Sequence, residues 1–383
     1  MYIILESGQS MKKRWSIEKI NEWYEKQPWL RGCNFMGSDC ANRIDQWQSL
    51  GFEERLITAD RELALAAETG MNTIRIILEY IVWRDEHDGF MERFERYLAT
   101  AARHGISCMV VFGNDCMPPK TEGWRPLQLG EQPCDWGYHG GRKNSQHGTF
   151  NIPGYHLLDD PEEAERHYEW VREIITRYKD DPRIIVWDLF NEPGNSNRGS
   201  MSLPHMKKFF EIAREIDPIQ PLTSGIWAFP EPMTSVVNLR ESLSEIQKYA
   251  LDNSDLITYH CYGSLERNVA IIKALRKYGR PIVNTEWLAR PLGNNVEEMY
   301  PLFYSNDIGC YMWGLVAGKY QTYEPWNAVW DQYEANPDLK WDFTKWFHDL
   351  YRPALRPYNP KEIELMKRIH ALADEEKKHE SNL

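Results

Sequence analysis

The sequence lacks the features of several broad protein classes. Its 383 residues contain no apolar run near the ~18–20 residues of a membrane helix, so we expect no membrane span. The seven cysteines are odd in number and include no C-x-x-C pair, which disfavours a disulfide framework. No N-x-[S/T] glycosylation acceptor occurs, and neither does an H-E-x-x-H or H-x-H motif. We therefore expect neither a metal nor another cofactor.

Positive charge is also scarce. Lys and Arg number 45 against 57 Asp and Glu, which gives a net charge of −12. Such a surface repels phosphate backbones and anionic membranes, so we expect no nucleic acid and no membrane as partner. Residues 1–5 are apolar, but no basic region precedes them, which is unlike a signal peptide. We expect a cytoplasmic protein; a secreted protein whose signal is missing from this sequence stays open, and no pattern predicts the oligomeric state.

Aromatic residues, in contrast, are abundant. The chain contains 16 Trp, 20 Tyr and 13 Phe. An indole N–H needs a hydrogen-bond partner when it is buried, so a core rarely uses so many tryptophans. We expect many of them to line a surface that binds a flat, partly polar ligand.

The chain alternates short apolar runs with amphipathic helical stretches. Buried parallel strands read as nearly continuous apolar runs. Eight such runs occur, at 32–36, 72–78, 107–112, 183–189, 221–227, 256–260, 281–286 and 309–313. Helices are predicted between them, at 53–69, 91–104, 161–178, 203–216, 239–250, 265–278 and 296–304. Eight β–α alternations predict an α/β protein with a (β/α)₈ TIM barrel.

We expect this barrel to form one domain over residues 31–351. An N-terminal extension, 1–30, would cap it, and a C-terminal helix with a frayed, charged tail would follow in 352–383. One connection is overlong: residues 113–160 follow the third strand and contain Trp124 and Trp136. In a barrel this loop rises from the C-terminal face, where active sites lie, so we expect it to wall the site.

Two predicted strands end in a glutamate. The run 184–190 leads into Asn191-Glu192-Pro193, and the run 281–286 ends in Glu286-Trp287. By our count these are strands 4 and 7, whose tips face each other across the mouth of a barrel. Two facing carboxylates satisfy the geometric requirement of glycoside hydrolysis. A lone glutamate is more often a salt-bridge partner, but the pair is more specific.

The ordered motifs resemble a known group of enzymes. Asn191-Glu192-Pro193, then His260-x-Tyr262, then Thr285-Glu286-Trp287 look like clan A glycoside hydrolases, and the pattern is most similar to the cellulase-like family 5. The matching motifs extend from Arg75 to Trp313, which is most of the chain.

The resemblance implies a role for each matching residue. Glu192 would be the acid/base and Glu286 the nucleophile, while Asn191 would bond the sugar 2-hydroxyl. Arg75 resembles the arginine of strand 2 and would pair with Glu286. We expect this pairing to hold the pKa of Glu286 low, and the charge of Glu286 to raise the pKa of Glu192. His260 would orient the substrate or the acid/base.

The same resemblance gives Tyr262 as a donor to the nucleophile and Trp313 as a platform under the sugar. Further candidates rest on their place just beyond strand ends alone. For Trp227 and Trp287, stacking on sugar is favoured over packing at the rim. For Asn34 and Asp115, a loop residue without ligand contact is as expected as a binding residue. These further candidates are Trp227, Trp287, Asn34 and Asp115.

The expected activity is therefore that of a retaining O-glycosyl hydrolase (EC 3.2.1.-). It would cleave β-glycosidic bonds of neutral oligo- or polysaccharides through a covalent glycosyl-enzyme intermediate. The net charge of −12 favours a neutral carbohydrate partner over an anionic polymer. Two alternatives remain open at this point: a retaining transglycosidase and a catalytically silent sugar-binding barrel.

Overall fold

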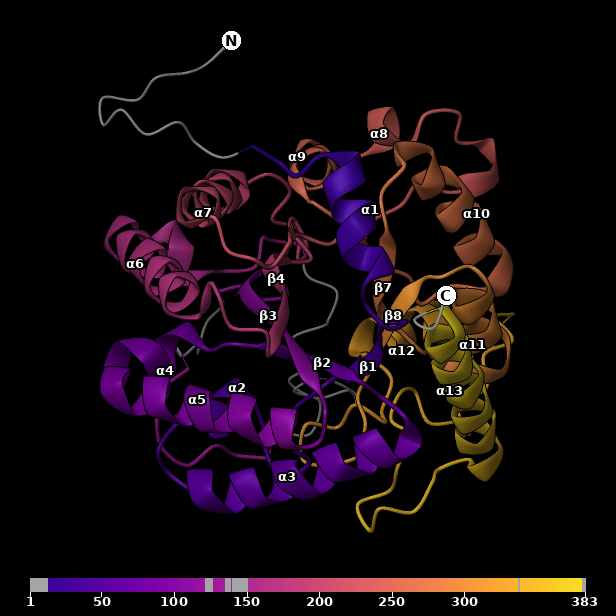
Figure 1. Ribbon diagram of the computed structural model, residues 1–383, viewed down its shortest axis with the longest axis horizontal. Coiled ribbons are helices and arrows are strands. Elements are labelled where there is room, and N and C mark those ends of the chain that lie inside the picture. Colours follow the sequence, from indigo (N-terminus) through magenta and orange to yellow (C-terminus); the bar gives the residue numbers. More distant parts are fainter. Residues whose placement is uncertain (1–12, 121–126, 135–138, 140–150, 337, 381–383) are drawn as a thin grey trace.

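The computed structural model describes residues 13–120, 127–134, 139, 151–336 and 338–380. At its centre lies one sheet of eight strands in the order β5-β4-β3-β2-β1-β8-β7-β6, in which every neighbouring pair is parallel. Ile226, three residues beyond the end of β5, forms a parallel bridge with Tyr259 of β6, so the sheet is nearly closed (Figure 1). The predicted single (β/α)₈ barrel is confirmed. The strands are β1 Arg31–Asn34, β2 Thr73–Ile77, β3 Ser107–Asn114, β4 Ile184–Asn191, β5 Leu222–Thr223, β6 Ile257–His260, β7 Ile282–Trp287 and β8 Gly309–Trp313.

All eight predicted strands are present, but β5 is much shorter than expected. It covers Leu222–Thr223 of the predicted run 221–227. The chain leaves the strand at Ser224, whose hydroxyl donates to the carbonyl of Phe190 at 2.8 Å. At Gly225 a Cβ atom would lie 3.3 Å from Nε2 of His260, so a larger residue would crowd that ring. The absence of a side chain at Gly225 thus leaves room for His260.

Helices surround the strands, as Figure 1 shows. Helix α3 ends directly at Gly70, and Gly105 and Gly279 follow within two and four residues of the ends of α5 and α10. Their φ values are 98°, 69° and 65°, in the left-handed region that suits glycine. The predicted helix 239–250 is divided, because Leu243 is extended and Ser244 precedes a new helix. The helices are α1 Ile17–Glu25, α2 Arg43–Trp47, α3 Phe52–Thr69, α4 Tyr80–Asp85, α5 His87–Arg103, α6 Pro161–Tyr178, α7 Leu203–Ile216, α8 Leu239–Ser242, α9 Glu245–Asn253, α10 Leu265–Leu275, α11 Val296–Ser305, α12 Asn327–Ala335 and α13 Pro360–Glu380.

The N-terminal segment packs against the inside of the barrel. Ile20 and Tyr24 of α1 belong to one buried cluster with Val186, Val283 and Tyr311, which come from β4, β7 and β8. Apolar side chains from the strands and α1 therefore fill the N-terminal end of the barrel. The opposite, C-terminal end is left for the polar groups described below.

The C-terminal segment is more regular than the sequence suggested. Helix α13 continues to Glu380, whereas the sequence predicted a frayed tail beyond the helix at 361–373. It packs beside α3 and α11, and Met366 is fully buried in the main core. Asp374 forms an ion pair of 2.7 Å with Arg31 of β1. This segment therefore packs as part of the barrel.

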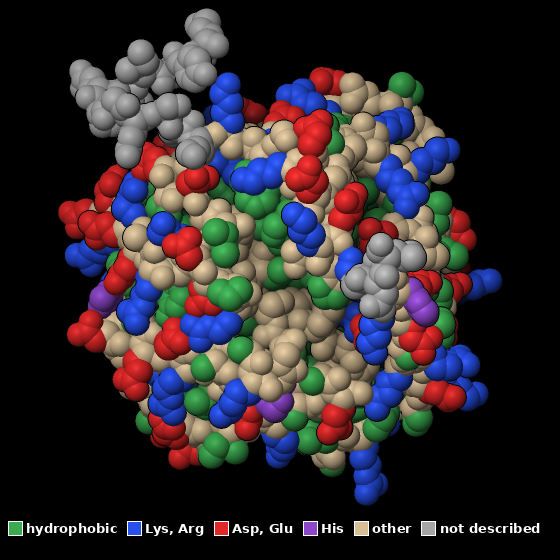
Figure 2. Space-filling view, in the orientation of Figure 1, with side chains coloured by type: hydrophobic (Ala, Val, Ile, Leu, Met, Phe, Trp, Pro, Cys, Tyr) green, Lys and Arg blue, Asp and Glu red, His purple; other side chains and the backbone are tan. Residues whose placement is uncertain are grey.

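Charged side chains cover the outside. Figure 2 shows acidic and basic groups interspersed over one face, and neither sign gathers there in an extended field. Within the described residues, no helix combines the length and the apolar character that crossing a bilayer requires.

Candidate active site

The two strand-end glutamates face each other at the C-terminal end of the barrel. Glu192 directly follows β4 and has a φ of 43°, while Glu286 is the second-last residue of β7. Both are buried, with 9% and 5% of their surface exposed. One carboxylate oxygen of each, together with a ring nitrogen of His260, forms a group whose atoms lie within 4.8 Å of one another. The topology thus brings together residues 94 positions apart in sequence.

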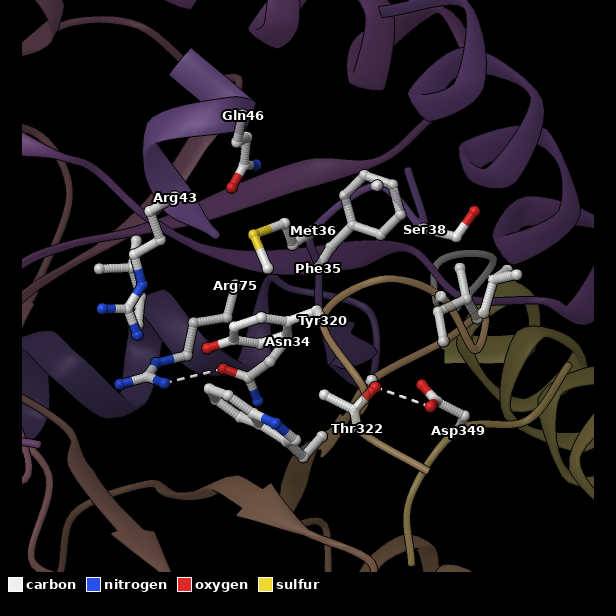
Figure 3. Close-up of a pocket in the computed structure, with 17 residues that line it drawn as sticks. Asn34, Phe35, Met36, Ser38, Arg43, Gln46, Arg75, Tyr320, Thr322 and Asp349 are labelled. Atoms are coloured by element: carbon white, nitrogen blue, oxygen red, sulfur yellow. Dashed lines mark hydrogen bonds between the residues drawn. The ribbon is translucent and has the colours of Figure 1, made fainter. Parts of the chain in front are cut away.

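Arg75 of β2 binds several of these side chains at once. Its Nη1 donates to Oε1 of Glu286 at 2.9 Å and to Oδ1 of Asn34 at 2.8 Å. Its Nη2 donates to Asp188 at 2.8 Å and to Oδ1 of Asn191 at 2.6 Å. The guanidinium is fully buried, and a buried cation requires such anionic partners. Figure 3 shows the Arg75–Asn34 contact.

The second oxygen of Glu286 faces β6. The hydroxyl of Tyr262 donates to Oε2 at 2.9 Å, and Nδ1 of His260 lies 3.4 Å from the same oxygen. Asn34 supports the strand that carries Glu286, because its amide donates to the carbonyl of Thr285 at 2.8 Å. Glu286 is therefore held in one orientation by Arg75, Tyr262 and its own strand.

Glu192 is held by a different set of donors. Nδ1 of His260 lies 2.7 Å from Oε1, and the thiol of Cys116 lies 2.9 Å from Oε2. The amide of Asn195 donates to the same Oε2. His260 therefore contacts both carboxylates and lies between them.

Burial and hydrogen bonding act in opposite directions on the pKa values of the two glutamates. Burial by itself raises the pKa of Glu192, but the hydrogen bond and charge of His260, with Cys116 and Asn195, lower it to about 2. Burial raises the pKa of Glu286, and the charge of Glu192 adds to this in spite of His260, Arg75 and Tyr262. Because His260 contacts both carboxylates, they titrate as a coupled pair, and the expected raised pKa of Glu192 and lowered pKa of Glu286 stay predictions.

A cavity of about 340 Å³ opens above the pair. Small-molecule sites commonly span about 300–1,000 Å³, so it has the size of a ligand pocket. Trp227 and Trp313 line it as predicted, and Trp227 donates from Nε1 to the carbonyl of Pro193 at 3.0 Å. Among the described residues, buried Nε1 of Trp313 and Nε2 of His260 have no protein partner.

Trp287 does not belong to this cavity. It is fully buried, with its ring 5.8 Å from Tyr300 and 5.2 Å from Phe303 of α11. The prediction that it stacks on sugar is wrong. Successive residues of a strand point to opposite faces, so Glu286 pointing into the barrel turns Trp287 outward against the helices.

Asp115 is a structural residue of the site. It is fully buried, accepts from Arg198 at 2.8 Å and Ser202 at 2.6 Å, and accepts from the backbone N–H of Gly194 at 2.7 Å. Its predicted contact with substrate is therefore wrong. Asp115 instead fixes the turn that follows Glu192. Asn34, likewise, acts through Arg75 and Thr285 and does not line the cavity between the glutamates.

Sequence reasoning missed several members of the site. Asp188 lies three residues before Asn191 on β4, and Asn195 lies three residues after Glu192, so both were within reach of the motif. Cys116 carries no sequence signal, because a buried cysteine is usually an ordinary core residue. His139 of the long loop also reaches the cavity, while Trp124 and Trp136 lie outside the described residues.

The described residues include one cluster close enough to share a metal ion: Glu192, His260 and Glu286. Arg75 already bonds to Glu286, and its positive charge opposes a second cation there. His260 already bonds to Glu192. We assign no metal to these residues, because their hydrogen bonds to one another account for their spacing.

Curated relatives match only part of the chain. Mannan endo-1,4-beta-mannosidase 8 of Oryza sativa subsp. japonica is 24% identical over 186 residues, 44% of this chain and 46% of that protein. A beta-glucuronidase of Paenibacillus borealis is 23% identical over 131 residues, 33% of this chain and 20% of that protein. The chain thus spans less than half the length of these relatives.

Solved structures match over more of the chain. Exo-beta-1,4-mannosidase Op5Man5 of Opitutaceae bacterium strain TAV5 is similar with a TM-score of 0.53 and 16% identity, over 97% of this chain and 62% of that one. The endo-1,4-beta-D-mannanase of Thermotoga petrophila RKU-1 gives 0.51 and 18%, over 88% and 99%. At such identities the likeness supports the barrel fold alone.

The family itself is shown by a longer match. Residues 34–318 match the family described as Cellulase (glycosyl hydrolase family 5), and this segment contains Arg75, Glu192, His260, Glu286 and Trp313. The predicted resemblance is confirmed: the chain belongs to glycosyl hydrolase family 5.

Proposed function

We propose that this glycosidase cleaves β-linked, mannose-containing oligosaccharides with net retention of configuration. Glu286 acts as the nucleophile and Glu192 as the acid/base. The observation that carries the mechanism is the short separation of the two carboxylates, whose nearer oxygens lie within 4.8 Å. Retaining glycosidases place their carboxyl groups about 5–5.5 Å apart, whereas inverting ones need about 6.5–9.5 Å to admit a water.

The surrounding contacts support these two roles. Arg75 and Tyr262 bond to Glu286 at 2.9 Å each, and such donors stabilise a carboxylate that must be ionised to attack. Glu192 follows directly on Asn191, whose amide is positioned by Arg75 and Asn114. Because Nδ1 of His260 contacts both carboxylates, a proton on the pair has a short path between them.

The reaction then proceeds in two displacements. In the first, a carboxylate oxygen of Glu286 bonds to the anomeric carbon, the glycosidic C–O bond breaks, and Glu192 gives its proton to the leaving oxygen. In the second, Glu192 takes a proton from water, the water oxygen bonds to the anomeric carbon, and the ester bond to Glu286 breaks. Before the first step Glu192 must hold its proton and Glu286 must be ionised.

Similar proteins, the lining of the cavity and the net charge support the substrate class. Several similar proteins bear the names mannanase or mannosidase, including those from Oryza sativa, Opitutaceae and Thermotoga petrophila. Trp227 and Trp313 line the cavity, and their aromatic surfaces suit the apolar face of a sugar ring. The net charge of −12 favours a neutral sugar.

Azide rescue tests the proposal most directly. Glu286→Ala should nearly abolish turnover of an activated aryl β-mannoside, and added azide should restore it. Azide then attacks the anomeric carbon from the face that the carboxylate had used, so the product is the α-glycosyl azide. For Glu192→Ala, activated aryl glycosides should suffer less than oligosaccharides, because a good leaving group needs little protonation.

A panel of aryl β-mannosides, glucosides, galactosides and xylosides identifies the sugar. The mannoside should give the highest kcat/KM. Wild-type rates for Glu286→Ala would overturn the nucleophile assignment, and a preference for another glycoside would overturn the sugar assignment while leaving the mechanism intact. Asp39 does not line the cavity, so Asp39→Asn removes one carboxylate elsewhere and is the matched control for Glu286→Ala and Glu192→Ala.

A further inference from the structure

The two ends of the active-site cavity differ in their surroundings. Trp313 lies on the Glu286 side, because its strand β8 pairs with β7. Trp227 lies on the Glu192 side, where its Nε1 donates to the carbonyl of Pro193 at 3.0 Å. A sugar attacked by Glu286 extends toward Trp313, and the leaving group that Glu192 protonates extends toward Trp227.

A cluster of rings closes the Trp313 end; we call His139, Trp313, Tyr320 and Trp326 the closing cluster. His139 stacks on Trp313, with ring centroids 5.3 Å apart and planes 19° from parallel. Nε1 of Trp326 donates to Nε2 of His139 at 3.1 Å, and the ring of Tyr320 lies 5.1 Å from it. His139 is 1% exposed, so these neighbours fix its position.

Among the described residues, a second and smaller cavity shares Trp313 and Tyr320 with the site (Figure 3). It measures about 40 Å³ against about 340 Å³ for the site. A bound water needs roughly 10–15 Å³ of such space, so this cavity has room for a few waters and none for a sugar ring. A second sugar on the Glu286 side therefore meets packed rings.

The opposite end faces solvent. Trp227 is half-buried, and Ala228 beside it is exposed. Phe229 and Arg267 line the same end of the cavity, so it offers apolar and polar contacts. A leaving group of more than one sugar can continue outward from Glu192 at this end.

We propose that the enzyme is exo-acting and removes single sugars from the non-reducing end of its substrate. His139 closes the glycone side and is the specificity-determining residue. This inference rests on the proposed function, since the two sides of the cavity are defined by the roles of Glu192 and Glu286.

A reducing-end-labelled tetrasaccharide of the preferred sugar tests the inference. Exo action produces labelled trisaccharide first, then disaccharide, with only the monosaccharide released at each step. The same tetrasaccharide with a 4,6-O-benzylidene group on its terminal sugar should not be cleaved. Labelled disaccharide as an initial product, or cleavage of the blocked substrate, would overturn exo action while leaving the β-glycosidase activity established.

Substitution of His139 tests its part separately. His139→Ala should raise the rate on the blocked tetrasaccharide at least about tenfold, because a removed steric barrier of this kind is worth at least ~1.4 kcal/mol. His87→Ala, on the exposed start of α5, should leave that rate unchanged. Thermal unfolding checks that both variants fold, and His139→Gln serves as a second variant if alanine does not. An exo pattern unchanged in every folded His139 variant would overturn the role of this residue. If no aryl β-glycoside is hydrolysed at all, the proposed function fails and this inference fails with it.

Discussion

The thiol of Cys116 lies 2.9 Å from Oε2 of Glu192, the carboxylate proposed as acid/base. Burial raises the pKa of this thiol well above its usual range, and the nearby charge of Glu192 adds to the effect. The thiol therefore keeps its proton and donates it in a hydrogen bond. A donor of this kind favours the ionised carboxylate, so Cys116 opposes the protonation that Glu192 needs as an acid.

Loss of this thiol should move the pH profile. In Cys116→Ala, we expect the basic limb of kcat/KM to shift to higher pH, because ionised Glu192 loses a donor. Hydrogen bonds to charged groups are worth about 1.5–3 kcal/mol and a thiol is a weak donor, so the shift should be about 0.5–1 unit. In Cys116→Ser the basic limb should stay near that of the wild type. Cys134→Ala, which replaces an exposed cysteine, should not shift the limb. An unchanged limb in Cys116→Ala would show that the contact does not tune Glu192.

Arg75 should contribute to stability as well as to the site. It is the shared partner of Asp188 and Glu286, and all three are buried. Arg75→Met leaves two carboxylates without their cation, which should lower the free energy of unfolding by about 3–5 kcal/mol. Urea denaturation measures this loss. The matched variant Arg103→Met removes an exposed ion pair with Asp60 and should cost less than about 1 kcal/mol.

A second substitution separates charge from packing. Adding Asp188→Asn to Arg75→Met removes one of the two uncompensated charges, so part of the lost stability should return. Activity should not return, because Glu286 still lacks its donor. If the double variant is no more stable than Arg75→Met, lost packing and not charge explains the cost.

Asp349 should make stability depend on pH. It is fully buried, accepts from Thr322 at 2.6 Å (Figure 3), and burial raises its pKa from 3.8 to about 7. The folded state then binds this proton more tightly than the unfolded state. The associated stabilisation is complete below 3.8 and is lost as the pH rises through about 7.

Asp349→Asn removes this dependence. The stability of the variant relative to wild type should increase from acidic to mildly alkaline pH. The increase should not exceed a few kcal/mol, because one pKa unit corresponds to about 1.36 kcal/mol. Thermal unfolding of both proteins across this pH range measures it. Asp88→Asn, at an exposed position, should show no such trend. A constant difference between Asp349→Asn and wild type would mean that Asp349 is ionised throughout.

Two tryptophans near the glutamates should respond differently to the same substitution. Trp313→Phe shrinks an aromatic ring that lines the cavity and removes an indole N–H that has no partner among the described residues, so KM should rise with little loss of stability. Trp287→Phe leaves a gap against Tyr300 and Phe303, so the melting temperature should fall while KM stays near the wild type. Steady-state kinetics and thermal unfolding of the two variants measure both effects. A raised KM in Trp287→Phe would restore its predicted role as a sugar platform.

The sequence by itself determined the barrel and the positions of the two glutamates. Apolar runs separated by amphipathic helices specify strands and helices locally, so eight units and their order were readable. The motifs Asn191-Glu192-Pro193 and Thr285-Glu286-Trp287 each lie within a few residues, so local reasoning placed both carboxylates at strand ends. The shortness of β5 could not be predicted from its own sequence. The glycine at position 225 is explained by the ring of His260, which belongs to another strand and lies against it.

Only the tertiary structure decided which neighbours these residues have. Trp287 and Asp115 both follow strand ends, but packing turned one against α11 and bound the other to Arg198. The tertiary structure also determines the proton affinity of Glu192. Its pKa depends on Cys116 and His260, which come from other parts of the chain. A sequence pattern predicts the strand or helix to which a residue belongs and its position along that element. Hydrogen bonds and charges act across space, between residues that the barrel brings together.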